Sequence, residues 1–155
     1  MARLAGPAER FLNVCAGSGT ILIERQQTLP CKEVYGCDTS AKARDAAAAN
    51  GVALEDWDAT KVLLEDGWAD AVVSDLPFGQ RIGTHAENVK LYPALLAEAA
   101  RLTRRGGQAV FLTHEIKLFE QTLDKRWQIE RVLNLTVGGM HPRLYVLQRS
   151  STTYP

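Results

Sequence analysis

The chain has 155 residues, 46% of them hydrophobic, which is enough to bury one core and indicates a single domain. Its 18 Lys and Arg residues balance 18 Asp and Glu residues, so we expect nucleic acid to bind this domain weakly on its own. Three cysteines without Cys-x-x-Cys spacing favour reduced thiols, and three scattered histidines make no metal-ligand cluster. With no signal peptide and no membrane-spanning apolar run, we expect a soluble, cytoplasmic protein.

Apolar runs in the first half of the chain predict four strands, at 11–16, at 33–37, within 52–60 and at 69–75. Helices are predicted between them at 21–26 and 41–50. Pro30 stops the first helix, and Thr39 or Ser40 is a suitable N-cap for the second. Strands and helices therefore alternate from the start.

In the second half, Pro93 predicts the first turn of a helix that ends in Arg104-Arg105-Gly106-Gly107, with the two basic residues at the negative end of the helix dipole and glycine after them. The remaining predicted elements are a strand at 108–113, a helix at 116–125, and strands at 128–137 and 143–148. Gly138-Gly139 joins the last two strands as an antiparallel hairpin. The whole pattern predicts an α/β fold, Rossmann-like, with a mostly parallel seven-stranded sheet and a C-terminal antiparallel hairpin.

Three candidate sites follow the first, second and fourth strands, where open α/β sheets bind ligands. The first is the loop Cys15-Ala16-Gly17-Ser18-Gly19-Thr20. Its glycines allow a tight turn, and the free amides of the following helix favour an anionic group. Leu22 occupies the place where a dinucleotide-binding loop needs a small residue, which argues against a nicotinamide or flavin cofactor. An ordinary glycine turn is the alternative.

Acidic residues mark the next candidate positions. Asp38 follows Gly19 by 19 residues, a spacing that suits acceptance of both hydroxyls of a ribose, although a helix cap is the simpler role. Asp58 follows the third predicted strand and is suited to an adenine amino group or to a solvated loop. Together with the glycine loop, Asp38 favours an adenosine-containing ligand.

The third site is Ser74-Asp75-Leu76-Pro77-Phe78-Gly79, directly after an apolar strand. The Asp75 carboxylate and the Leu76 carbonyl can accept hydrogen bonds from a planar amine, while Phe78 offers a stacking face. The polar loop from Gln80 to His85 is suited to close over a substrate, with Arg81 either on phosphate or in solvent. The run therefore predicts chemistry on a nucleobase or a similar amide.

These motifs carry a family resemblance. Residues 13–24 resemble the cofactor loop Asp-Pro-x-Cys-Gly-Ser-Gly-Thr of class I S-adenosylmethionine-dependent RNA methyltransferases. Residues 75–79 are similar to the corresponding run of THUMP-associated tRNA guanine-N2 methyltransferases, as is a continuation made of Gly83, Asn88, Leu91, Tyr92 and Pro93. The resemblance covers nearly the whole chain as a catalytic domain, 1–155, and implies an upstream RNA-binding domain that this sequence lacks.

The resemblance implies S-adenosyl-L-methionine as cofactor, RNA (most specifically tRNA) as partner, and no metal. The implied cofactor residues are Asn13, Ala16, Gly17, Ser18, Gly19, Thr20, Asp38, Thr39, Asp58, Ala59 and Asp75, and the implied base-binding residues are Asp75, Leu76, Pro77 and Phe78. Asn13 and Val14 replace the family's Asp and Pro, which weakens the expected contact to the cofactor's ammonium. The alternatives are an adenine-N6 or protein-glutamine methyltransferase, or a degenerate cofactor-fold module without activity.

Overall fold

The computed structural model describes residues 1–77 and 84–151. Its strands are β1 (Arg10–Val14), β2 (Glu33–Cys37), β3 (Ala69–Asp75), β4 (Thr103–Thr113), β5 (Trp127–Asn134) and β6 (Arg143–Arg149). Its helices are α1 (Thr20–Thr28), α2 (Ala41–Ala49), α3 (His85–Leu102) and α4 (Ile116–Thr122). No helix in the described ranges is long and apolar enough to cross a membrane.

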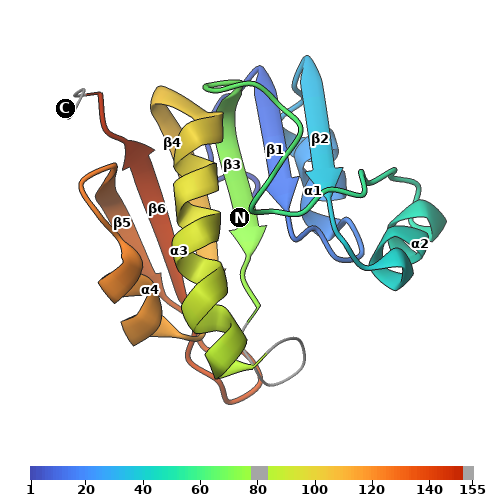
Figure 1. Ribbon diagram of the computed structural model, residues 1–155. Helices are drawn as coiled ribbons and strands as arrows, with labels where there is room; N and C mark the ends of the chain where they lie inside the picture. The colour runs from blue at the N-terminus through green and yellow to red at the C-terminus, as the bar shows by residue number, and fades with distance from the viewer. Residues whose placement is uncertain (78–83, 152–155) are drawn as a thin grey trace.

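The strands form one sheet in the order β2-β1-β3-β4-β6-β5 (Figure 1). β2, β1, β3 and β4 run parallel, while β6 is antiparallel to both β4 and β5. The predicted C-terminal hairpin is therefore confirmed. Because β1, β2 and β3 are parallel neighbours, their carboxyl ends meet at one edge of the sheet, which brings the three candidate sites together.

The prediction of seven strands is wrong for the described residues, which form six. The missing strand is the one expected within 52–60. There Glu55 makes a single bridge to Cys37, with its amide donating to the Gly36 carbonyl at 2.8 Å. Residues 55–58 are Glu-Asp-Trp-Asp, and this acidic run lacks the apolar alternation that a paired edge strand needs. β2 is consequently an edge of the sheet.

Helices cover both faces of the sheet (Figure 1). On one face, α3 and α4 supply Leu95, Leu96 and Phe119 to the larger hydrophobic core. On the other face, Leu22 of α1 and Ala47 of α2 belong to a second core. Strands buried between two such layers have to be apolar on both sides, which explains the continuous apolar runs of β1 and β3.

The predicted start of α3 at Pro93 is wrong. The helix begins at His85, where Thr84 and Glu87 form a reciprocal capping box, and Pro93 lies inside the helix. An internal proline costs about 3 kcal/mol through a lost hydrogen bond and a steric clash. Burial of Tyr92 and the neighbouring leucines offsets that cost. The expected loop from Gln80 lies mostly outside the described residues.

The pair Arg104-Arg105 also lies elsewhere than predicted, because α3 ends at Leu102 and β4 begins at Thr103. Arg104 Nε donates to Asp70 Oδ1 at 2.5 Å, so its charge joins β3 to β4 instead of capping the helix. The same Asp70 carboxylate accepts from the Arg10 amide of β1 at 2.9 Å. One carboxylate thus joins three adjacent strands at the end of the sheet opposite the candidate sites.

Candidate functional site

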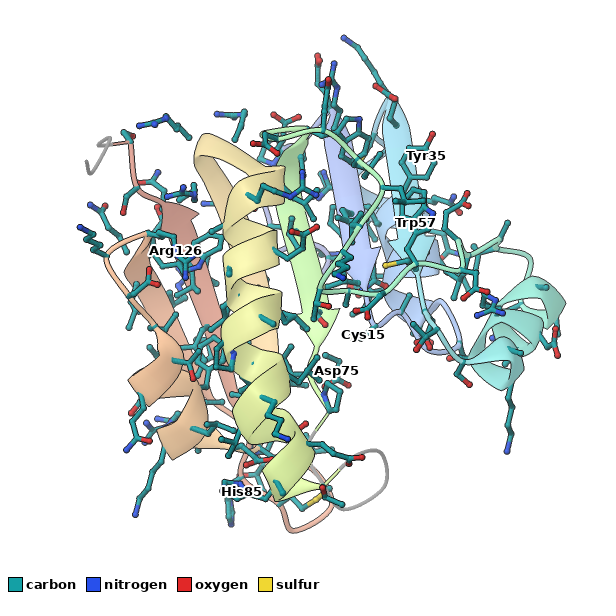
Figure 2. The ribbon with its side chains drawn as sticks, in the orientation of Figure 1. Cys15, Tyr35, Trp57, Asp75, His85 and Arg126 are labelled. Carbon is teal, nitrogen blue, oxygen red and sulfur yellow. The ribbon has the colours of Figure 1, made fainter. Side chains whose placement is uncertain are left out.

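A cavity of about 990 Å³ lies at the carboxyl ends of β1, β2 and β3. Its walls come from the loop after β1, the start of α2, the segment at 57–59 and the turn after β3. Figure 2 shows Cys15 and Asp75 at the ends of neighbouring strands. Of the predicted site residues, those lining the cavity are Ala16, Gly17, Ser18, Thr20, Asp38, Thr39, Asp58, Ala59, Asp75, Leu76 and Pro77.

The glycine loop makes the tight turn expected from its sequence, with several residues at positive φ. Gly17 and Gly19 have φ of 55° and 78°, and Cys15 has φ of 51°, which is rare for a residue with a side chain. A Cβ atom on Gly19 would lie 2.3 Å from a Val52 methyl, whereas one on Gly17 would meet nothing within 4 Å. Gly19 is therefore needed for packing, and Gly17 leaves open the space in front of the loop.

Asp38 joins the ends of β1 and β2. Its Oδ2 accepts from the Gly17 amide and its Oδ1 from the Ser40 amide, both at 2.9 Å. The half-buried carboxylate thus supports the glycine loop and holds the amide of Ser40, and Ser40, not Asp38, is the N-cap of α2. Since each carboxylate oxygen has two lone pairs, one on each oxygen remains for a ligand hydroxyl.

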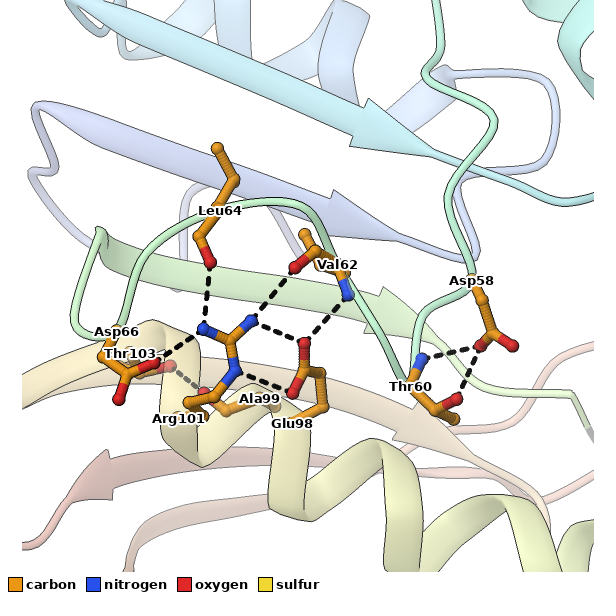
Figure 3. A network of polar contacts seen from close by, with 9 residues as sticks. All are labelled: Asp58, Thr60, Val62, Leu64, Asp66, Glu98, Ala99, Arg101 and Thr103. Atoms are coloured by element: carbon orange, nitrogen blue, oxygen red, sulfur yellow. Dashed lines mark hydrogen bonds and ion pairs between the residues drawn. The ribbon is translucent and has the colours of Figure 1, made fainter.

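Asp58 is exposed at the rim of the cavity. Its Oδ1 accepts from the Thr60 amide at 2.8 Å and from the Thr60 hydroxyl at 2.7 Å, and these bonds hold its pKa below the usual range (Figure 3). The neighbouring Trp57 lines the cavity and packs on Tyr35, with ring centroids 5.7 Å apart. An ionised acceptor and an aromatic ring therefore lie side by side on this wall.

The segment that follows Asp58 is fastened to α3 by one guanidinium group (Figure 3). Arg101 donates to the carbonyls of Val62 and Leu64 at 3.0 and 2.9 Å and to Asp66 Oδ1 at 2.7 Å. It also pairs with Glu98, whose carboxylate accepts from the Val62 amide at 2.8 Å. Because α3 is anchored in the core, these bonds fix the position of the segment that carries Asp58 at the cavity.

Asp75 ends β3 and is exposed to the cavity. Within the described residues its carboxylate makes no hydrogen bond. Desolvation raises its pKa above the usual range, against a smaller opposing effect of His114. Burial, with the negative charges of Asp38, Asp58 and Asp75 as smaller causes, raises the pKa of the Cys15 thiol to about 12.

The turn after Asp75 rests on two residues of α3 for which the sequence suggested no physical role. The Pro77 carbonyl accepts from the Asn88 side-chain amide at 3.0 Å and from the Tyr92 hydroxyl at 2.7 Å. Asn88 and Tyr92 are fully buried, and their i, i+4 spacing places them on one face of a helix. The i, i+4 spacing could have indicated a shared role, but the helix was predicted to start at Pro93, which left both residues outside it.

Asn13 differs from the expectation for a cofactor residue. It is fully buried and is not among the residues that line the cavity. Its amide donates to the Val73 carbonyl at 2.9 Å, which joins β1 to β3, while its Oδ1 has no partner among the described residues. Gly19 likewise lies behind the cavity wall, and Phe78 lies outside the described residues.

No cluster of His, Cys, Asp and Glu suited to a metal is present in the described ranges. The site thus consists of a glycine loop, a carboxylate that retains lone pairs, a rim with an aromatic ring, and the Asp75 carboxylate, which has no hydrogen-bond partner among the described residues.

Comparison with known proteins gives the class and the family. The fold is the Rossmann-like α/β fold of class I methyltransferases: TrmN from Thermus thermophilus superposes with a TM-score of 0.80 at 29% identity, covering 95% of this chain and 46% of that structure. Residues 34–143 match the family model UPF0020, described as RMKL-like, methyltransferase domain. The chain belongs to that family.

Two sequence relatives have related names. A Thermus thermophilus tRNA (guanine(6)-N2)-methyltransferase is 31% identical over 153 residues, 94% of this chain and 46% of the relative. The Mus musculus tRNA (guanine(6)-N(2))-methyltransferase THUMP3 is 33% identical over 122 residues, 75% of this chain and 24% of the relative. The chain thus spans less than half the length of either relative.

Proposed function

We propose that this chain is an S-adenosylmethionine-dependent methyltransferase domain that acts on the exocyclic N2 amine of a guanine in tRNA. The observation that carries the proposal is the Asp75 carboxylate, exposed in the cavity and unpaired within the described residues. The family assignment and the two named relatives support the reaction and the substrate.

The residues of the cavity suit S-adenosylmethionine. The open space before Gly17 leaves room for the methionine portion, and amides at the start of α1 favour its carboxylate. Asp38 retains lone pairs for the ribose hydroxyls, and Asp58 with Trp57 offers an acceptor and a ring to adenine. When bound, this cofactor supplies an electrophilic methyl group on a sulfonium.

The chain's own residues would then orient the acceptor. The guanine amine is a poor nucleophile because its lone pair is delocalised into the ring. Asp75 and the Leu76 carbonyl would accept its two hydrogens, which turns the lone pair toward the methyl group. Asp75 would take up the proton that the nitrogen loses when it is methylated. Holding the reacting atoms about 3 Å apart accounts for most of the acceleration.

The target base has to be extruded from its stack and presented to the cavity, and we expect this chain alone to bind RNA weakly. A base inside a helical stack has to be extruded first, and stacking on Phe78 would offset that cost. With 18 positive and 18 negative side chains, this chain provides little general attraction for phosphates. We therefore propose that a separate RNA-binding domain presents the tRNA, as the resemblance implied.

The direct test uses tRNA transcripts that differ in a single exocyclic group. Transfer of labelled methyl from S-adenosylmethionine is expected with guanine at the target position and not with inosine, which lacks the N2 amine. Digestion to nucleosides should yield N2-methylguanosine. N6-methyladenosine, or label in protein glutamine, would replace the proposed substrate with one of the alternatives. Absence of any thermal shift at millimolar cofactor would favour a module without activity.

A further inference from the structure

The carbonyl proposed to accept from the amine, that of Leu76, lies between two anchors. On its N-terminal side, the Leu76 amide donates to the Leu112 carbonyl of β4 at 2.9 Å, which extends the strand pairing. On its C-terminal side, the Pro77 carbonyl accepts from Tyr92 at 2.7 Å and from Asn88 at 3.0 Å. The Leu76 amide and the Pro77 carbonyl, which lie on either side of the Leu76 carbonyl, are thus both held in place.

Few backbone rotations remain between these anchors. The peptide groups are planar, and the ring of Pro77 locks its φ near −65°. The direction of the Leu76 carbonyl is therefore determined by where the Leu76 amide and the Pro77 carbonyl are held. Loss of the second anchor would free the φ and ψ angles of Leu76, which set the direction of its own carbonyl.

The same bonds determine which hydrogen-bond acceptors of the turn remain available to a substrate amine. A carbonyl oxygen has two lone pairs, and the two donors of α3 occupy both on Pro77. Pro77 is consequently unable to compete for the hydrogens of a substrate amine. Among the described residues of this turn, the Leu76 carbonyl and the Asp75 carboxylate remain as acceptors for the two hydrogens of a primary amine.

Glu115 fixes the orientation of the Asn88 side-chain amide. The Asn88 side-chain amide donates one hydrogen to Pro77 and the other to Glu115 Oε1, at 2.5 Å. A flipped amide would place Oδ1 against two acceptors, so this orientation is the stable one. The Tyr92 hydroxyl also contacts the buried Thr113 hydroxyl at 3.0 Å, and burial raises its pKa to about 12, which keeps its proton available.

We propose that Asn88 and Tyr92, backed by Glu115, are positioning residues that aim the Leu76 carbonyl at the substrate amine. The proposal deepens, and rests on, the function proposed above. None of the three is among the residues that line the cavity. They act through the Pro77 carbonyl, and this gives a physical reason for an Asn and a Tyr at i, i+4 in the helix that follows the acceptor run.

The first experiment needs no activity. In a chain of 17.1 kDa, amide hydrogen exchange is measurable residue by residue by NMR. Tyr92→Phe should accelerate exchange of the Leu76 amide about 5- to 10-fold while leaving Val72 and Val73 unchanged, because a lost hydrogen bond loosens only the turn. Tyr145→Phe is the matched control, since it removes another core tyrosine hydroxyl, one that donates to Glu120 at 2.7 Å.

The second experiment measures transfer to tRNA. Tyr92→Phe should lower kcat about 10-fold and Asn88→Asp, which turns two donors into acceptors, about 100-fold, with cofactor affinity unchanged. Tyr145→Phe should keep the parental kcat. Unaltered exchange at Leu76 together with unaltered kcat in Tyr92→Phe would overturn the proposal. If the parent chain transfers no methyl even at low salt and at tRNA concentrations high enough to offset its weak binding, the proposed function fails, and the exchange data alone then decide whether the anchors hold the turn.

Discussion

The substitution Asp75→Ala separates catalysis from stability. The carboxylate makes no hydrogen bond within the described residues, so its removal breaks none of the described contacts. Desolvation raises its pKa, which means that the folded chain ionises it less readily than the unfolded chain does, and that its charge destabilises the fold at neutral pH. The melting temperature of Asp75→Ala should therefore equal or exceed that of the parent.

The expected loss of activity is large. A hydrogen bond to a charged acceptor contributes about 1.5–3 kcal/mol, or roughly 10- to 150-fold, and misorientation of the amine multiplies this. We expect kcat/KM to fall at least about 100-fold for Asp75→Ala and about 10-fold for Asp75→Asn, which keeps an acceptor oxygen without the charge. Cofactor affinity, followed by calorimetry, should stay within about twofold, since the proposed function assigns Asp75 to the substrate amine.

Asp38→Ala provides the opposite pattern. It removes the acceptor of the Gly17 and Ser40 amides, so cofactor affinity should fall about 10-fold or more at the cost of about 1–2 kcal/mol of stability. If Asp75→Ala lost cofactor binding and transfer to the same extent, the assignment of Asp75 to the acceptor half would be refuted. A lowered melting temperature would refute the reasoning about its charge.

Three further predictions concern the supports of the site. Gly19→Ala should unfold or strongly destabilise the chain because its Cβ would lie 2.3 Å from a Val52 methyl. Gly17→Ala should fold with a loss of about 1 kcal/mol in stability, because of its positive φ, and should lose cofactor affinity. Arg101→Met should cost about 2–3 kcal/mol in urea unfolding and weaken cofactor binding, and Arg101→Lys should not restore it. Burial raises the pKa of Cys37 to about 12, so stability should fall as pH rises from 9 to 12, and less so in Cys37→Ala.

Each of these has a contrary outcome. Equal stability of the two glycine variants would contradict the packing role of Gly19. Full rescue by Arg101→Lys would mean that charge alone, and not the forked geometry, holds the segment at 60–66. In the thiol experiment the unfolded chain loses its proton near the ordinary pKa while the folded chain retains it, so stability that rises with pH in this window would contradict the burial of Cys37.

The sequence was sufficient where the signal is local. An apolar run that stops at Asp75-Leu76-Pro77 predicts β3 and its turn, because proline and a charge end a buried strand. Ser40 caps α2 as expected, its hydroxyl accepting from the Ala43 amide at 3.3 Å. Parallel strands then bring their carboxyl ends together, so the meeting of Asp38 and Asp75 in one cavity also followed from the alternation of elements.

Contacts between distant segments could not be deduced in this way. The burial of Asn13 depends on the Val73 carbonyl, 60 residues away, and the third predicted strand failed because Glu55 pairs with β2 at one residue only. The support of Pro77 by Asn88 and Tyr92 appears only once α3 packs beside β3. Local patterns thus determined the elements and the residue types at the strand ends. Packing decided which polar groups line the cavity and which hold the framework, because hydrogen-bond partners are chosen by proximity in space.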